Sequence, residues 1–186
     1  MKPNRTSRKR RDRQGSGPYA WAAQVFFLAI GLSAALSLAS QGPLSSAGIL
    51  VALLILALFI ALGIVFDIIG VAVTAADPKP FHSMAAHKEK GATEALMLLR
   101  NAGRVSSVCN DVVGDICGIV SGTTAAVIVT RLQAAFSIQN VLLSVAVTAL
   151  ISGLTIGGKA LGKTFAIQRS TKVVYWSGRF LHLFHR

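Results

Sequence analysis

Residues 47–75, "AGILVALLILALFIALGIVFDIIGVAVTA", decide the fold, because Asp67 is the only charged residue among them. An apolar run longer than about 18 residues is typical of a membrane-spanning helix. This run is longer than a bilayer needs, so we expect the helix to tilt or to project from the membrane. Only 14% of the chain is charged, against about 25% in an ordinary soluble domain. The sequence therefore predicts an integral membrane protein.

Three further apolar segments bring the predicted number of spans to four, at residues 19–41, 107–130 and 141–156. Tyr19 and Trp21 open the first span, as aromatic anchors at a membrane surface do. The uncharged stretch "QGPLSS" (residues 41–46) is predicted to be a turn. The fold class that follows is an all-α integral membrane protein with four transmembrane helices.

The net charge of +12 comes from basic residues that gather in three segments, at residues 2–13, 79–104 and 159–186. Such clustering beside apolar spans is the positive-inside pattern. It predicts cytoplasmic N- and C-termini in a plasma or inner membrane, with anionic headgroups of the bilayer as partner. A nucleic-acid partner for "TSRKRRDR" (residues 6–13) is the less favoured alternative. Four spans satisfy the requirement that all three basic segments lie on one side.

Three polar segments complete the predicted organisation. Residues 1–18 form a basic leader rich in Ser, Gly and Pro, which we expect to be disordered. Residues 79–106 begin near two prolines and alternate apolar patches with Lys and Glu, which predicts a helical hairpin at the cytoplasmic interface. The segment after the fourth span, "KTFAIQRSTKVVYWSGRFLHLFHR", combines basic and aromatic residues and predicts a C-terminal amphipathic helix.

The string "GGKALGKT" (residues 157–164) matches the phosphate-binding loop of nucleotide hydrolases. That loop needs a preceding strand and an α/β domain, whereas a membrane span precedes it here, so we expect no nucleotide cofactor. We interpret its glycines as points where a helix breaks or where helices pack closely. No Ser-His-Asp, Cys-His or HExxH arrangement is visible, and we do not expect an enzyme.

Two segments resemble one known family. "MAAHKEKGATEALMLL" (residues 84–99), followed by "RNAGRV" and an apolar span, is similar to the juxtamembrane hairpin of the CNNM/CorB/CorC magnesium transporters. That family follows its last span with Gly-Glu-x-x-Pro-Lys-Thr-Leu-Ala, to which "GKALGKTFA" (residues 158–166) aligns. Its next span after the hairpin opens on Gly-Asn, where this chain has Gly114 and Asp115.

The resemblance covers residues 47–186 and implies a membrane domain of three spans plus the hairpin, usually a homodimer, that passes Mg²⁺. The helix at residues 19–41 would be an addition to this domain. The cystathionine-β-synthase domain pair that follows in the family is not expected, because the sequence ends at Arg186.

Two departures from the family pattern concern its cation site. The resemblance implies a Glu at position 70 and another at position 159, but Gly70 and Lys159 stand there. Mg²⁺ binds oxygen ligands, and a lysine ammonium near such a site would repel it.

Three carboxylates lie in the predicted spans, where charged side chains suggest function by default. Asp111 and Asp115 are four residues apart, hence on one face of a regular helix, with Asn110 beside them. One interpretation is an oxygen site for Mg²⁺ or another cation, built from Asp67, Asn110, Asp111 and Asp115, in a protein that transports or senses divalent cations. The alternative is a non-transporting scaffold or accessory subunit, in which Lys159 neutralises Asp67 or Asp115.

Overall fold

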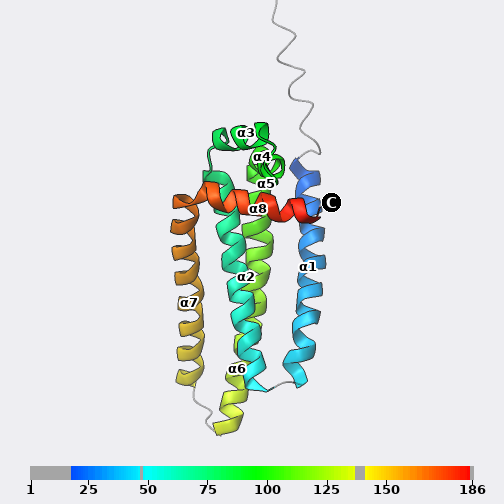
Figure 1. The fold of residues 1–186 in the computed structure, drawn as a ribbon. Coiled ribbons are helices and arrows are strands. Elements are labelled where there is room, and N and C mark those ends of the chain that lie inside the picture. Colours follow the sequence, from blue (N-terminus) through cyan, green and yellow to red (C-terminus); the bar gives the residue numbers. More distant parts are fainter. Residues whose placement is uncertain (1–17, 47, 137–140, 185–186) are drawn as a thin grey trace, which may run out of the picture.

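The computed structural model describes residues 18–46, 48–136 and 141–184, and every regular element in these ranges is a helix. Four of the helical segments are long and apolar enough to cross a membrane: Tyr19–Gly42, Ile49–Ala75, Ala102–Ala135 and Ser144–Gln168. They run side by side (Figure 1). The prediction of an all-α membrane protein with four spans is confirmed. The predicted leader lies, except for Pro18, outside the described residues.

The first two spans are α1 (Pro18–Ser46) and α2 (Ile49–Ala75). The predicted turn at residues 41–46 is wrong, because α1 continues through it to Ser46. A proline inside a helix removes one backbone hydrogen bond and disfavours the helix; α1 nevertheless continues three residues past Pro43 to Ser46. The end of α2 follows its sequence, since Ala76 is extended and Asp77 precedes Pro78, a position that disfavours helix.

The predicted hairpin is confirmed as α3 (Lys79–Ala86) and α4 (Ala92–Arg100). The turn between them has two left-handed residues, Lys88 with a φ of 56° and Gly91 with a φ of 88°. The hairpin lies at the end of the spans where α1 begins and where α8 runs (Figure 1). Phe81 of α3 is fully buried and fixes the hairpin on the membrane helices.

The third span is a continuous helical segment made of α5 (Ala102–Ser107), the π-helix η2 (Val108–Gly114) and α6 (Asp115–Phe136). It begins five residues before the predicted start at residue 107, so residues 102–106 belong to the span and not to the hairpin. Asn101 separates α4 from this helix. The seven residues of η2 are an irregularity that the sequence pattern did not indicate.

The fourth span, α7 (Val141–Gln168), continues twelve residues past the predicted end at residue 156. The glycines of "GGKALGKT" therefore do not break the helix, and no phosphate-binding loop forms there. They allow close packing instead: a Cβ built on Gly158 would lie 2.6 Å from Ile64, and one on Gly162 would lie 3.0 Å from Ile68. Of the two interpretations of these glycines, close packing is correct.

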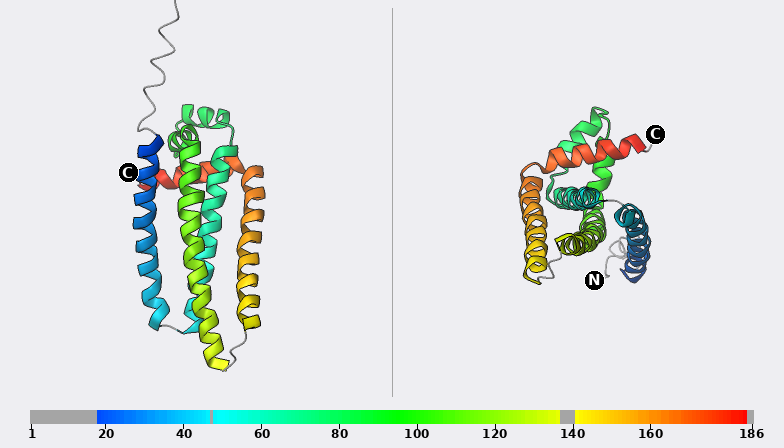
Figure 2. Two further views of the ribbon diagram at one scale, coloured as in Figure 1. Left: turned by 180° about the vertical axis from the view of Figure 1, so that it is seen from behind. Right: turned by 90° about the horizontal axis from the view of Figure 1, so that it is seen from below.

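The predicted C-terminal amphipathic helix is confirmed as α8 (Ser170–Phe184), which crosses the ends of the spans instead of running along them (Figures 1 and 2). Its inner side is anchored by Val174, which is fully buried in an apolar core at the hairpin end of the molecule. That core contains Ala72, Val73, Phe81, Ala95, Leu96, Ala166 and Val174. Helix α2 contributes to this core and to both apolar cores within the spans, so it is the central helix of the fold.

Candidate cation site

One face of α2 approaches the third span, at η2 and the start of α6, through two glycines with a carboxylate between them. A Cβ built on Gly63 would lie 3.3 Å from the Cβ of Cys117, and one built on Gly70 would collide with the side-chain amide of Asn110. Asp67 is four residues after Gly63 and three before Gly70, so it lies on the same face. It is 5% exposed. The seam between α2 and η2 therefore buries the Asp67 carboxylate inside the membrane-spanning region.

Asn110 belongs to η2 and is directed at α2 by its neighbours. Its Nδ2 donates to Ser106 Oγ at 3.2 Å, which leaves Oδ1 on the side of Gly70. Isolated π-helical turns are frequent at functional sites. Here the π-helix contains the residue whose amide oxygen faces the central helix.

Three buried side-chain oxygens have no hydrogen-bond partner among the described residues: Asp67 Oδ2, Asn110 Oδ1 and Ser121 Oγ. An unsatisfied buried polar group destabilises a protein by about 1–3 kcal/mol. Asp67 and Asn110 lie on facing helices at one seam, and an oxygen-binding cation between these helices would satisfy both acceptors. A carboxylate and an amide oxygen are the ligand types that Mg²⁺ prefers.

The nearest cation to Asp67 is Lys163 of α7, whose Nζ lies 3.9 Å from Asp67 Oδ2. The lysine side chain is 55% exposed and the carboxylate 7%. Because the lysine side chain is more than half exposed and the two atoms are 3.9 Å apart, this ion pair holds Asp67 only weakly. Lys163 was not among the residues selected from the sequence, although it lies one helical turn beyond Lys159.

Lys159 lies on the same side of α7, and its Nζ is 3.7 Å from a Cβ built on Gly114. It therefore faces the π-helix. In the alternative interpretation of the sequence, Lys159 neutralises Asp67 or Asp115, whereas the ion pair that the structure forms with Asp67 is made by Lys163. Two lysines thus border the seam.

Asp111 and Asp115 have exposed side chains. Asp111 accepts a hydrogen bond from Ser107 Oγ at 2.7 Å. Within the described ranges, no three or more His, Cys, Asp or Glu side chains gather in a way that could hold a metal ion. Of the four predicted ligands, the structure brings Asp67 and Asn110 to one seam and exposes the other two.

These features define a helical membrane protein with a polar seam at its central helix and a hairpin at one end. The family model described as "Cyclin M transmembrane N-terminal domain" (CNNM) matches residues 53–186. The chain therefore belongs to the CNNM family of membrane transporters, whose transmembrane domain is associated with divalent cation transport. The match begins within α2, so α1 precedes it. No curated protein and no solved structure matches the chain.

Proposed function

We propose that this protein transports or senses a divalent cation, with Mg²⁺ as the ion, and that Asp67 and Asn110 provide its binding site. The supporting observation is the pair of buried oxygens, Asp67 Oδ2 and Asn110 Oδ1, that lack hydrogen-bond partners on facing helices within the described chain. Mg²⁺ retains several water ligands when proteins bind it through one or two carboxylates. A site with one carboxylate and one amide oxygen therefore suits a partly hydrated ion.

Lys163 has a defined part in this proposal. Its ammonium group stands 3.9 Å from Asp67 Oδ2, where a dication would also be attracted, and the two cations repel each other. Because the Lys163 side chain is more than half exposed, it can move into solvent when the ion arrives. Lys163 then acts as a displaceable counter-charge that keeps the carboxylate neutralised between ions.

The same ion pair favours a second candidate function. If Lys163 stays on Asp67, while Lys159 of α7 faces the π-helix close by, the seam is a permanently neutralised packing element. The protein would then be a non-transporting membrane scaffold or accessory subunit.

We further propose that the protein is a homodimer that associates through α6. One side of this helix, continued by Asp111 of η2, exposes two carboxylates and three small residues. They are Asp111, Asp115, Gly118, Gly122 and Ala126. Nothing lies within 4 Å of a Cβ built on Gly118 or Gly122, and this spacing of small residues favours helix association in membranes. Carboxylates exposed on a span are costly against lipid. A second copy would shield them.

The hairpin and α8, whose sequences carry many of the basic residues, lie at one end of the spans (Figure 1). By the positive-inside rule, we propose that this end and both termini are cytoplasmic.

Magnesium flux into proteoliposomes that contain a Mg²⁺-sensitive dye tests the function. In the transport proposal, wild-type protein produces flux above that of empty liposomes, and Asp67→Asn lowers it at least tenfold by removing the only charged ligand. Asp77→Asn is the matched control, because Asp77 is exposed just beyond α2 and its Oδ1 accepts from the Lys79 N–H at 3.0 Å, a role that Asn retains.

The two functions give different results in this assay. If the protein is a scaffold, the wild-type protein produces no magnesium flux. Lys163→Gln or Lys159→Glu then creates flux, because each substitution removes a neutralising positive charge. Wild-type flux that survives in Asp67→Asn would instead show that ions cross elsewhere, and both proposals for this seam would fail.

A further inference from the structure

A groove of about 570 Å³ lies in the corner between α2, α7 and α8. Val65 and Ile68 of α2 and Phe165 of α7 line its apolar part, and Trp176 and Phe180 of α8 line it from across the span ends. Phe165, Trp176 and Phe180 are more than half exposed. An exposed apolar surface of this kind marks an interaction site, and beside membrane spans an acyl chain can cover it.

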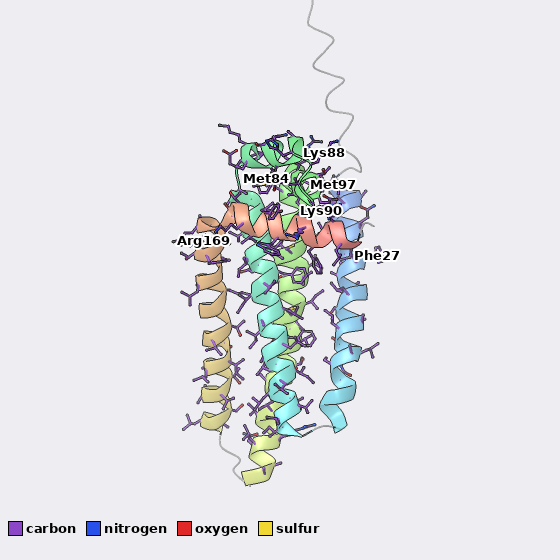
Figure 3. All side chains as sticks on the ribbon, in the orientation of Figure 1. Phe27, Met84, Lys88, Lys90, Met97 and Arg169 are labelled. Atoms are coloured by element: carbon purple, nitrogen blue, oxygen red, sulfur yellow. The ribbon has the colours of Figure 1, made fainter. Side chains whose placement is uncertain are left out.

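The polar side of the groove is positively charged. Arg169 and Lys172 line it at the junction of α7 and α8, and both are exposed; Figure 3 shows Arg169 at this corner. No acidic side chain of the described residues lines the groove. The guanidinium of Arg179 lies 5.6 Å from the centre of the Trp176 ring, a cation–π contact that holds the aromatic wall.

We propose that this groove binds one anionic phospholipid. Its phosphate pairs with Arg169 and Lys172, and an acyl chain lies along Val65, Ile68 and Phe165. The orientation of α8 supports this assignment, because a helix that crosses the span ends with basic and aromatic residues lies at headgroup depth. The basic residues lie at one end of the groove and the apolar walls follow, as the phosphate and the acyl chains follow each other in a phospholipid.

Charge complementarity selects this occupant over two others. Free phosphate satisfies the two cations but leaves the aromatic and aliphatic walls uncovered. A zwitterionic lipid covers the walls but brings its own ammonium group to a site that already has two cations. An anionic lipid satisfies both parts, and each basic residue near a membrane surface strengthens such binding severalfold.

Trp176 provides a local fluorescent reporter. The chain has two tryptophans, so Trp21→Phe leaves Trp176 alone. The full chain with this change is reconstituted in nanodiscs of unlabelled phosphatidylcholine that contain a small fraction of brominated phosphatidylglycerol or brominated phosphatidylcholine. We expect the anionic brominated lipid to quench Trp176 at a mole fraction on the order of tenfold lower than the zwitterionic one.

Two double variants test the recognition in the same background. Arg169→Gln with Lys172→Gln is expected to abolish the preference for the anionic lipid. Lys79→Gln with Lys88→Gln removes the same charge from exposed positions on the hairpin and is expected to preserve it. Circular dichroism of each variant verifies that the helices remain.

Three results would overturn the assignment. One is equal quenching by the two brominated lipids. Another is relief of the anionic quenching by millimolar glycerol phosphate, which would mean that the site recognises phosphate without the acyl chain. The third is protection of Trp176 from both lipids together with a cross-link between copies at this corner, which would mean that a second copy covers the groove.

Discussion

The crossing of α4 and α8 has no room for a side chain at Gly178. A Cβ there would lie 2.5 Å from the carbonyl oxygen of Gly91 and 2.8 Å from the backbone N of Ala95. Because these are backbone atoms, Gly178→Ala must move α8 by about 0.9 Å to restore an ordinary 3.4 Å contact (3.4 minus 2.5). Overpacking of this kind destabilises by about 1–3 kcal/mol, with the upper end expected where the backbone is rigid. The better helix propensity of Ala offsets about 1 kcal/mol of it.

The net expectation for Gly178→Ala is a loss of about 2 kcal/mol, or about 4–8 °C in the melting temperature of the detergent-purified protein, at about 2–4 °C per kcal/mol. Gly103→Ala is the matched control, since Gly103 lies in α5 and nothing is within 4 Å of a Cβ built there; this variant should melt at or above the wild-type temperature. If Gly178→Ala melts as high as the control, α8 does not pack on the hairpin backbone as described.

Three further substitution sets examine packing and charge. Gly162→Leu should destabilise by about 2 kcal/mol or more, whereas Gly162→Ala should cost less than about 1 kcal/mol, because the ends of isoleucine side chains can yield; equal melting temperatures would refute the α2–α7 contact. Lys163→Leu should destabilise by at most about 1 kcal/mol, because the exposed ammonium group makes only a weak ion pair with Asp67; a loss of several kcal/mol in thermal unfolding would contradict this. The 2.7 Å contact between His182 Nδ1 and Glu94 Oε1 predicts a coupling energy of about 1 kcal/mol in a double-mutant cycle, and a value near zero would mean that it does not tie α8 to the hairpin.

The sequence predicted the helices whose limits depend on local signals. The apolar run of α2 and the Asp77-Pro78 step define that helix, and the structure has it at Ile49–Ala75. The hairpin and the amphipathic helix were likewise evident from charge and aromatic patterning. These features depend on neighbouring residues, which is why one sequence suffices to place them.

The extents of α1, α5 and α7 were not predictable in the same way. Gly158 and Gly162 are poor helix formers, but their packing against Ile64 and Ile68 keeps α7 helical through them. The π-helix also depends on tertiary contacts, since Asn110 lies against Gly70 of another helix. Tertiary packing outweighed local propensity in α7.

The candidate site was predicted in part. Asp67 and Asn110, both selected from the sequence as candidate ligands, lie at one seam, and Asp67 is conspicuous as an acid within an apolar run. Lys163 was missed, since a lysine near the end of a span has the composition of an interfacial residue. Only the course of α7 past residue 156 brings Lys163 to Asp67, and that course was itself not predicted.

The departure from the family pattern at position 70 leaves a space that Asn110 fills in this chain. The resemblance implies a Glu there, but the amide of Asn110 lies where the Cβ of any residue at position 70 would be. A carboxylate at position 70 and the observed position of Asn110 are therefore incompatible. Asn110 Oδ1 remains a buried acceptor at this point of the seam, and Asp67, one turn away on α2, supplies the charge. The seam thus has two buried acceptor oxygens and a single negative charge. One lysine, Lys163, pairs with that charge, and its departure would leave the carboxylate unpaired.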